Sequence, residues 1–170
     1  MIKKSVYRSF LLLLILTCNP LSANTLEQIL DEECKMVPRD IVLRVVTHES
    51  KSTYQGRIQP WPWTLNIDGK GYYFSNYHKA LLAAIKAHRN GAEKLGIGFG
   101  QIEWKYHKDR FDKNIAAALH PRRNIKVVCE ILVEAWSSKR VKTWEDAIAY
   151  YHRPVLDNIA RKYAEKVLAL

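Results

Sequence analysis

The chain has 170 residues, of which 48% are hydrophobic, and a formal net charge of +10 at pH 7. This length allows one domain with a hydrophobic core and excludes two domains that are each large enough to form a stable core. The positive charge favours a polyanionic partner, such as nucleic acid or an anionic cell wall, and a solvated basic surface without a particular partner is the alternative.

The first residues have the pattern of an export signal. A basic start precedes an apolar run over residues 10–16, and small residues follow at 21–23. Because the run is too short to span a bilayer, residues 1–23 are predicted to be a removed signal peptide and 24–170 the exported, periplasmic domain. An uncleaved N-terminal anchor and lipidation at Cys18 are the alternatives. No later stretch is long and apolar enough to cross a membrane.

Export changes the meaning of both the charge and the cysteines. Loss of the three basic residues of the signal leaves a net charge of +7, and an exported protein meets the cell wall rather than cytoplasmic nucleic acid. The mature chain keeps two cysteines, Cys34 and Cys129, in an oxidising compartment. A disulfide between them is therefore predicted, with two buried thiols as the alternative.

Helical spacing of apolar residues begins at Thr25, which forms a capping-box pair with Gln28 and opens a short helix that carries Cys34. Pro38 suits the first turn of a second helix. Glu49 is expected on the inward face of this helix, at its last turn, because helical residues four apart share a face. The apolar residues of that face are Ile41, Val42, Val45 and Val46.

The helical pattern stops between residues 50 and 76. Asp68-Gly69 lies between two segments rich in aromatic and β-branched residues, which predicts a small β-hairpin. Most aromatic side chains of this region are expected to pack the hairpin onto the helices, while one or two remain for contact with a ligand. These aromatic residues are Trp61, Trp63, Tyr72, Tyr73 and Phe74.

Helices return after the hairpin. A third helix precedes the glycine-rich stretch 96–100, where the backbone must turn tightly or approach something closely. Further helices begin at Pro121, at Thr143 and after Pro154, which predicts a mainly α-helical α+β domain with the hairpin as a small insertion. The expected inward residues are Leu81, Leu82 and Ile85, then Ile125, Val128, Cys129, Leu132, Val133 and Trp136, then Trp144, Ile148 and Tyr151, then Tyr163 and Val167.

Glu49 is the strongest candidate for chemistry. Burial on an apolar face and the negative end of the helix dipole both disfavour ionisation, so its pKa is predicted to be raised, as a general acid near neutral pH requires. The alternatives are that Glu49 caps a local network of hydrogen bonds or forms an ion pair with Lys51 or Arg57. No metal or cofactor is indicated, because the histidines lack ligand spacing and Gln101 stands where a dinucleotide-binding loop needs glycine.

Three short motifs follow one another in the mature chain. They are Thr-His-Glu-Ser at residues 47–50, Gly-Phe-Gly-Gln-Ile at 98–102 and Ala-Ile-Ala-Tyr-Tyr-His at 147–152. Together they resemble the signature of the soluble-lytic-transglycosylase-like family, whose fold is similar to goose-type lysozyme. Residues 61–66 and 104–107 resemble members encoded with conjugation and secretion systems. The resemblance implies a lysozyme-like fold with a cleft for the glycan strands of peptidoglycan.

The resemblance also assigns roles to particular residues. Glu49 matches the single catalytic acid and base, and Tyr151 matches the tyrosine that supports its carboxylate. Gln101 matches the glutamine of the loop that lines the cleft, and Ser50 follows Glu49 as a residue that orients the substrate or the carboxyl. The other expected substrate contacts are Gly98, Phe99, Ile102 and His152, of which His152 replaces the usual asparagine and has a plain surface position as its alternative.

The implied reaction cleaves the β-1,4 bond between N-acetylmuramic acid and N-acetylglucosamine and leaves a 1,6-anhydro ring. An ordinary glycosidase needs two carboxylates, whereas a transglycosylase can use one. Glu103 stands where many relatives carry an amide, and a second acid would permit hydrolysis by water. A lysozyme-like hydrolase and a catalytically inactive wall-binding module are therefore the alternatives. A conjugation or secretion apparatus is the expected protein partner, and nucleic acid is not expected.

Overall fold

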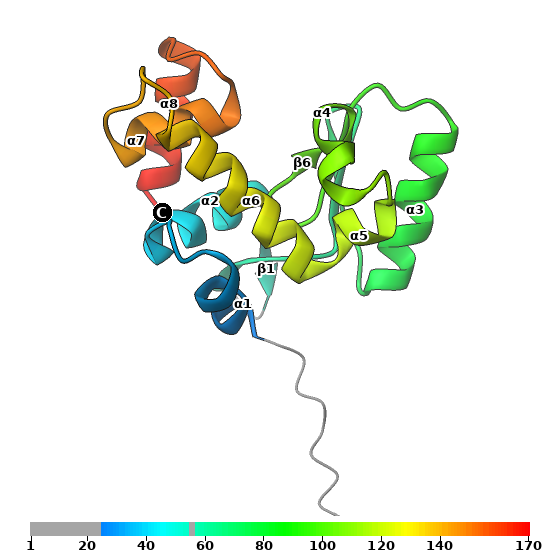
Figure 1. Ribbon diagram of the computed structural model, residues 1–170. Coiled ribbons are helices and arrows are strands. Elements are labelled where there is room, and N and C mark those ends of the chain that lie inside the picture. The colour runs from blue at the N-terminus through cyan, green and yellow to red at the C-terminus, as the bar shows by residue number, and fades with distance from the viewer. Residues whose placement is uncertain (1–24, 55–56) are drawn as a thin grey trace, which may run out of the picture.

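The computed structural model describes residues 25–54 and 57–170, so the predicted signal peptide lies outside the described residues. Within them the chain forms a mainly helical α+β domain (Figure 1). No helix in this part of the chain is long and apolar enough to cross a membrane. The helices are α1 Leu26–Glu33, α2 Arg39–Ser50, α3 Tyr77–Arg89, α4 Trp104–His107, α5 Ile115–Leu119, α6 Pro121–Trp136, α7 Trp144–His152 and α8 Asn158–Leu168, with a 3-10 helix η1 at Lys108–Phe111.

The strands of the described residues form two separate antiparallel sheets. One is a two-stranded hairpin, β1 with β2, that follows α2 directly. The other has four strands in the order β4-β3-β5-β6. Only the β3-β4 part of this sheet was predicted from the sequence. The strand bounds are β1 Lys51–Tyr54, β2 Arg57–Pro60, β3 Thr64–Ile67, β4 Lys70–Tyr73, β5 Leu95–Ile97 and β6 Ile102–Glu103.

The hairpin turn predicted at Asp68-Gly69 is confirmed. Asp68 has φ 51° and Gly69 has φ 88°, and two positive φ angles in succession fit the type I′ turn that matches the twist of paired strands. The side chain of Asn66 accepts a hydrogen bond from Gly69 N at 2.9 Å, and that of Asp68 accepts one from Lys94 N at 2.9 Å. The turn is thereby tied to the residue that precedes β5.

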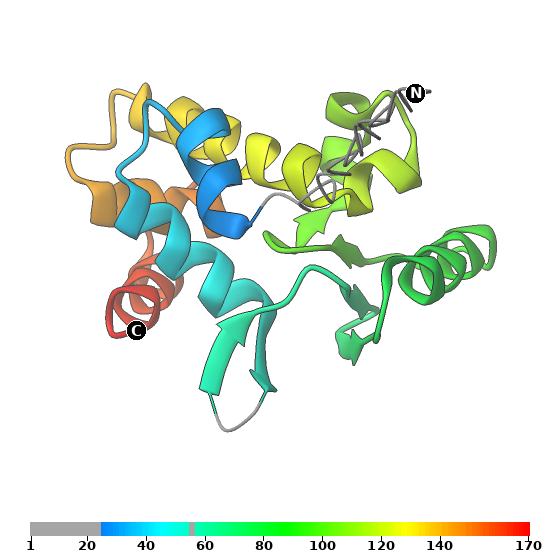
Figure 2. The same cartoon turned by 90° about the horizontal axis from the view of Figure 1, so that it is seen from below.

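Helix α6 runs through the middle of the domain and packs against elements at both of its ends. Helices α1 and α7 contact it, and so do α5 and β6. Figures 1 and 2 show the consequence: α1, α2, α7 and α8 gather on one side, while α3, α4 and α5 lie with the four-stranded sheet on the other. Helix α2 packs on α8 and continues into the β1-β2 hairpin, so its last turn lies between the two sides.

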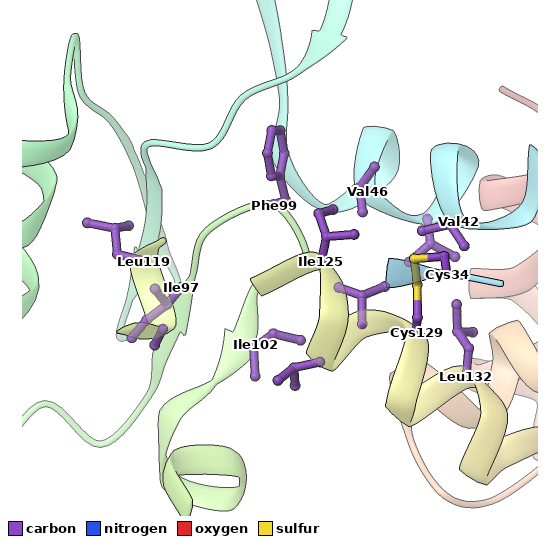
Figure 3. Packing of buried hydrophobic residues seen from close by; sticks show 14 of the residues in the cluster. Cys34, Val42, Val46, Ile97, Phe99, Ile102, Leu119, Ile125, Cys129 and Leu132 are labelled. Atoms are coloured by element: carbon purple, nitrogen blue, oxygen red, sulfur yellow. A yellow bond between two sulfur atoms is a disulfide. The ribbon is translucent and has the colours of Figure 1, made fainter. Parts of the chain in front are cut away.

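One large hydrophobic cluster joins these parts. Apolar residues of α2 and α6 face one another in it, together with residues of β5 and the following loop (Figure 3). A disulfide between Cys34 and Cys129 links the end of α1 to α6, with the two Cα atoms 5.5 Å apart. The predicted pairing is confirmed, and Cys34 is the residue that caps α1 rather than a member of the helix. The capping box of Thr25 and Gln28 is also confirmed.

Two apolar side chains that were predicted to face inward are exposed. Leu82 is 56% exposed, because α3 buries its alanines, whose small side chains let the helix approach the sheet closely. Trp136 is 43% exposed, and its ring stacks on Trp144 with the centroids 4.3 Å apart. A helical period identifies a broad face, and it does not decide which residue at the edge of that face is covered.

Candidate active site

Glu49 lies in the last turn of α2, on the face that carries the buried residues of that helix. Its Oε1 accepts a hydrogen bond from the phenol of Tyr163 in α8. Burial raises the pKa of Glu49 to about 7, and the hydrogen bond from Tyr163 opposes part of this rise. Glu49 forms no ion pair with any described side chain. The expected raised pKa is confirmed, and the carboxyl is about half protonated at neutral pH.

Two histidines hold the ring of Tyr163. His152 stacks on it with the centroids 4.3 Å apart and the planes at 11°, and His48 meets its edge with the centroids 5.1 Å apart. Burial lowers the pKa of both histidines, and the positive charges of Lys51 near His48 and Arg153 near His152 act in the same direction. Both rings are therefore mainly neutral at neutral pH. The structure thus gives His152 a contact with Tyr163, and its ring does not line the pocket described below.

The loop after β5 presents Gln101 to the site. Gly98 has φ 73° and Gln101 has φ 45°, so the backbone makes a left-handed bend on either side of the loop. The Nε2 atom of Gln101 donates hydrogen bonds to Thr64 Oγ1 at 3.0 Å and to Gly98 O at 2.9 Å. These bonds fix the amide group, and the side chain keeps a single orientation at the edge of the sheet.

Asn124 of α6 holds the same loop, although no motif in the sequence pointed to this residue. It is fully buried in α6, where its Nδ2 donates to Ile97 O and Ala118 O and its Oδ1 accepts from Gly100 N, all at 2.9 Å. A Cβ at Gly98 would lie 2.7 Å from Nδ2 of Asn124, so this position requires glycine. The available signal was a polar residue beside the apolar face of that helix.

Tyr151 forms its hydrogen bond with the loop and interacts with Glu49 through charge alone, so its expected support of the carboxylate stays a prediction. Its phenol donates a hydrogen bond to Gly100 O at 2.8 Å. A Cβ at Gly100 would lie 2.2 Å from Val128 Cγ2 and 2.8 Å from Tyr151 Oη, so the loop is packed tightly against both. The phenol that bonds to Glu49 belongs to Tyr163, which helical spacing placed inward but to which no role was assigned.

A pocket of about 340 Å³ opens beside Glu49. Three of its residues form a row across the sheet, because Asn66 pairs with Gly96 and Gly96 pairs with Glu103. Side chains of directly opposed residues lie on one face of a sheet, and the Gln101 side chain lies over Gly96, where a Cβ would be 3.0 Å from its Oε1. The pocket is lined by Glu49, Asn66, Gly69, Lys94, Gly96, Gln101 and Glu103.

Three predicted substrate contacts belong to the interior instead. Ser50 is fully buried, and its hydroxyl donates to Val46 O at 2.7 Å and accepts from Trp61 N at 3.2 Å. Phe99 is 6% exposed and Ile102 is 3% exposed, and both pack in the hydrophobic cluster (Figure 3). Side chains this deeply buried offer almost no surface to a ligand, so the burial of these three residues gives no support to the contacts expected of them.

The aromatic residues of the hairpin pack mainly onto the helices, as expected. Trp63 meets Tyr77 of α3 edge to face, and Trp61 donates a hydrogen bond to Phe74 O at 2.8 Å. The described lining of the Glu49 pocket includes none of the five aromatic residues of this region. Tyr73 is 58% exposed, so it stays a candidate for contact with a longer ligand outside the pocket.

A second, larger hollow of about 440 Å³ lies among η1, α5 and α6. Among the described residues that line it, the only carboxylate is Asp112, which forms an ion pair with Arg123 at 3.1 Å. Asp112 is exposed to solvent, so this hollow lacks a buried carboxyl comparable to Glu49 among its described lining residues. The chemistry therefore points to the smaller pocket beside Glu49.

No family model, curated protein or solved structure matches this chain. Among the described residues, no group of three or more His, Cys, Asp or Glu side chains is placed to hold a metal ion. The candidate active site is thus defined by its own geometry. It consists of the Glu49 carboxyl, whose pKa is raised, and the Tyr163 phenol, which donates a hydrogen bond to that carboxyl. A polar pocket lies beside them, and Gln101 of the loop after β5 lines it.

Proposed function

We propose that this protein is an exported lytic transglycosylase with a lysozyme-like fold, which cleaves the glycan strands of peptidoglycan. The observation that carries the proposal is Glu49, a carboxyl whose pKa is raised to about 7 at the edge of an open polar pocket. A general acid works best when its pKa lies near the operating pH. The resemblance of the three motifs supplies the substrate class, and the positive charge suits an anionic wall.

In the proposed reaction, protonated Glu49 gives its proton to the oxygen of the β-1,4 bond as that bond breaks. The acetamido oxygen of the muramic residue attacks the anomeric carbon of that residue, from which the bond has broken, and forms a cyclic intermediate. Glu49, now a carboxylate, takes the proton of the 6-hydroxyl of that sugar. The alkoxide oxygen attacks the sugar carbon, releases the acetamido group and closes the 1,6-anhydro ring. One carboxyl thus serves as acid and then as base.

Tyr163 has a direct part in this cycle. Its hydrogen bond to Glu49 lowers the pKa of the carboxyl against the rise that burial produces. The phenol therefore stabilises the carboxylate that forms when the proton leaves, and it orients the oxygen that must later accept a proton. Gln101 borders the pocket with its amide already hydrogen-bonded, so binding a sugar there costs little ordering of the side chain.

Glu103 favours a second candidate, a lysozyme-like hydrolase. It lines the same pocket as Glu49, and a second carboxylate there could activate water. One of its oxygens already accepts a hydrogen bond from Leu95 N at 2.9 Å, which ties it to the start of β5. This bond occupies one carboxyl oxygen and restrains the side chain, so we favour the reaction that needs only one acid.

Digestion of purified peptidoglycan by the mature chain tests the proposal. Mass analysis of the soluble products should find fragments that end in 1,6-anhydro-muramic acid, and Glu49→Gln should abolish their release. Reducing-end fragments would assign the hydrolase, and Glu103→Gln should then remove the activity. Wall binding that survives Glu49→Gln, with no fragments released by the natural chain, would assign the inactive binding module.

We further propose that cleavage opens the wall locally for an envelope-spanning conjugation or secretion apparatus. The segments that resemble members encoded with such systems, residues 61–66 and 104–107, support this role. Residues 104–107 form α4, whose Tyr106 is 74% exposed and so available to a partner. Co-purification of the apparatus with the natural chain, and its loss on Tyr106→Ala, is the expected result. Unchanged co-purification of the apparatus with the Tyr106→Ala chain would show that Tyr106 does not contribute to this contact.

A further inference from the structure

We propose that Lys94 and Asn66 form a carboxylate-binding subsite within the Glu49 pocket, and that this subsite selects glycans whose muramic residue carries a carboxylate. The inference rests on the proposed function for the identity of the polymer. It goes beyond that function because the resemblance assigns no role in substrate binding to Lys94 or Asn66. The ligand group is a carboxylate, from either the lactyl ether of a peptide-free muramic residue or an attached stem peptide.

The backbone of Lys94 is held at the rim of the pocket. Its N–H donates to Asp68 Oδ1 at 2.9 Å, and its carbonyl accepts from Asp68 N at 3.0 Å. This pair of bonds joins the residue to the rigid turn of the β3-β4 hairpin. Lys94 is exposed and lines the pocket, and it takes part in no ion pair with a described side chain. Its position is therefore fixed while its ammonium group stays available.

Asn66 adds a second donor on the same side of the pocket. Its Oδ1 is occupied by the N–H of Gly69 at 2.9 Å, which fixes the orientation of the amide. The amide nitrogen then faces away from that bond, and it has no acceptor among the described residues. An ammonium and an amide N–H together suit the two oxygens of a carboxylate.

The rest of the pocket determines where a carboxylate can lie. Gly96 stands between Asn66 and Glu103 in the row across the sheet, and the Gln101 side chain lies over it, since a Cβ at Gly96 would be 3.0 Å from Gln101 Oε1. Glu103 at one end of the row and Glu49 in α2 would repel a carboxylate when ionised. A bound carboxylate is therefore expected beside Lys94 and Asn66. The carboxylate of Asp68 in this part of the sheet already accepts a hydrogen bond from the Lys94 N–H.

Binding measurements on the Glu49→Gln chain test the subsite without requiring turnover. The probes are a peptide-free muramyl tetrasaccharide, a peptide-bearing muramyl tetrasaccharide and a chitin tetrasaccharide that has no carboxylate. Lys94→Gln should weaken binding of at least one muramyl ligand about tenfold, because it removes a charged donor, and should leave the chitin ligand unchanged. Lys94→Arg should restore most of the affinity. Whichever muramyl ligand responds identifies the source of the carboxylate.

Lys79→Gln is the matched control, since it removes the same charge from the exposed side of α3, outside the pocket. It should change none of the three affinities by more than a small factor. Equal weakening of all three ligands by Lys94→Gln, or no weakening of either muramyl ligand, would overturn the subsite. Cleavage assays with the natural chain report on the proposed function separately, so failure of one does not imply failure of the other.

Discussion

The phenol of Tyr163 donates a hydrogen bond to the carboxyl of Glu49 from a helix that lies 114 residues later in the chain. Helices α2 and α8 pack directly on each other, which brings the two groups together in a part of the molecule that also forms the hydrophobic core. The carboxyl is thus held by one specific donor while burial opposes its ionisation. This combination allows the same group to give and then regain a proton near neutral pH.

Replacing Tyr163 by phenylalanine removes the donor and leaves the ring between its two histidines. Because the hydrogen bond lowers the pKa of Glu49, its loss should move that pKa further upward. The rate of glycan cleavage should fall about tenfold or more, and the pH at which activity declines should shift to higher values. Rate measurements across pH on purified peptidoglycan check both effects. Tyr106→Phe, on the exposed side of α4, is the control and should change neither.

Removal of the Glu49 charge should stabilise the fold at alkaline pH. The pKa rises from 4.5 in the unfolded chain to about 7 in the folded one, so the folded state is penalised progressively as pH increases through this range. Glu49→Gln should therefore match the natural chain below pH 4.5 and exceed its unfolding free energy by about 1–3 kcal/mol above pH 7. Urea titrations at pH 4 and pH 8 measure the difference. A gap of equal size at both pH values would contradict this linkage.

A methyl group added at Gly100 should disturb the loop that carries Gln101. The new Cβ would lie 2.2 Å from Val128 Cγ2 and 2.8 Å from Tyr151 Oη. We expect Gly100→Ala to lower the unfolding free energy by about 2 kcal/mol or more through overpacking, and to reduce cleavage as well. Gly71→Ala is the matched control, because the nearest atom to its Cβ would be 3.9 Å away. Equal, small effects of the two substitutions would show that the loop adapts easily.

Reduction of the Cys34–Cys129 disulfide should destabilise the domain strongly. The bond closes a loop with a sequence separation of 95 residues, and the chain-entropy model gives such a crosslink roughly 4–5 kcal/mol. Thermal unfolding with and without a strong reductant measures the loss. The double substitution Cys34→Ser with Cys129→Ser should reproduce it and should no longer respond to reductant. An unchanged melting temperature on full reduction would show that packing alone secures α1 to α6.

Local signals in the sequence predicted much of this fold correctly. The capping box at Thr25, the Asp68-Gly69 turn and the pairing of the two mature cysteines all depend on short patterns or simple counting, and all three are confirmed. The inward position of Glu49 follows from helical spacing within a single helix. Strands β5 and β6 have three and two residues, which is too few for an alternating pattern to show.

The parts of the site that the sequence did not reveal depend on contacts between distant segments. Nothing near Tyr163 indicates that its phenol meets Glu49, because the contact arises only when α8 packs on α2. Ser50 follows the candidate acid, but consecutive residues of a helix point in different directions. The Ser50 side chain is fully buried, and its hydroxyl donates a hydrogen bond to Val46 O. The row of Asn66, Gly96 and Glu103 that lines the pocket likewise requires three strands in register. Spacing along the chain contains no information about such registers.

A titration of the Glu49 side-chain carboxyl by carbon-13 NMR tests the central claim most directly. Comparison of spectra from the natural chain and from Glu49→Gln assigns the resonance. The titration should show a midpoint near pH 7, the value that burial and the Tyr163 hydrogen bond together produce. A midpoint near the ordinary value of 4.5 would show a solvated carboxylate that is ionised at neutral pH, and it would contradict the role of Glu49 as the proton donor.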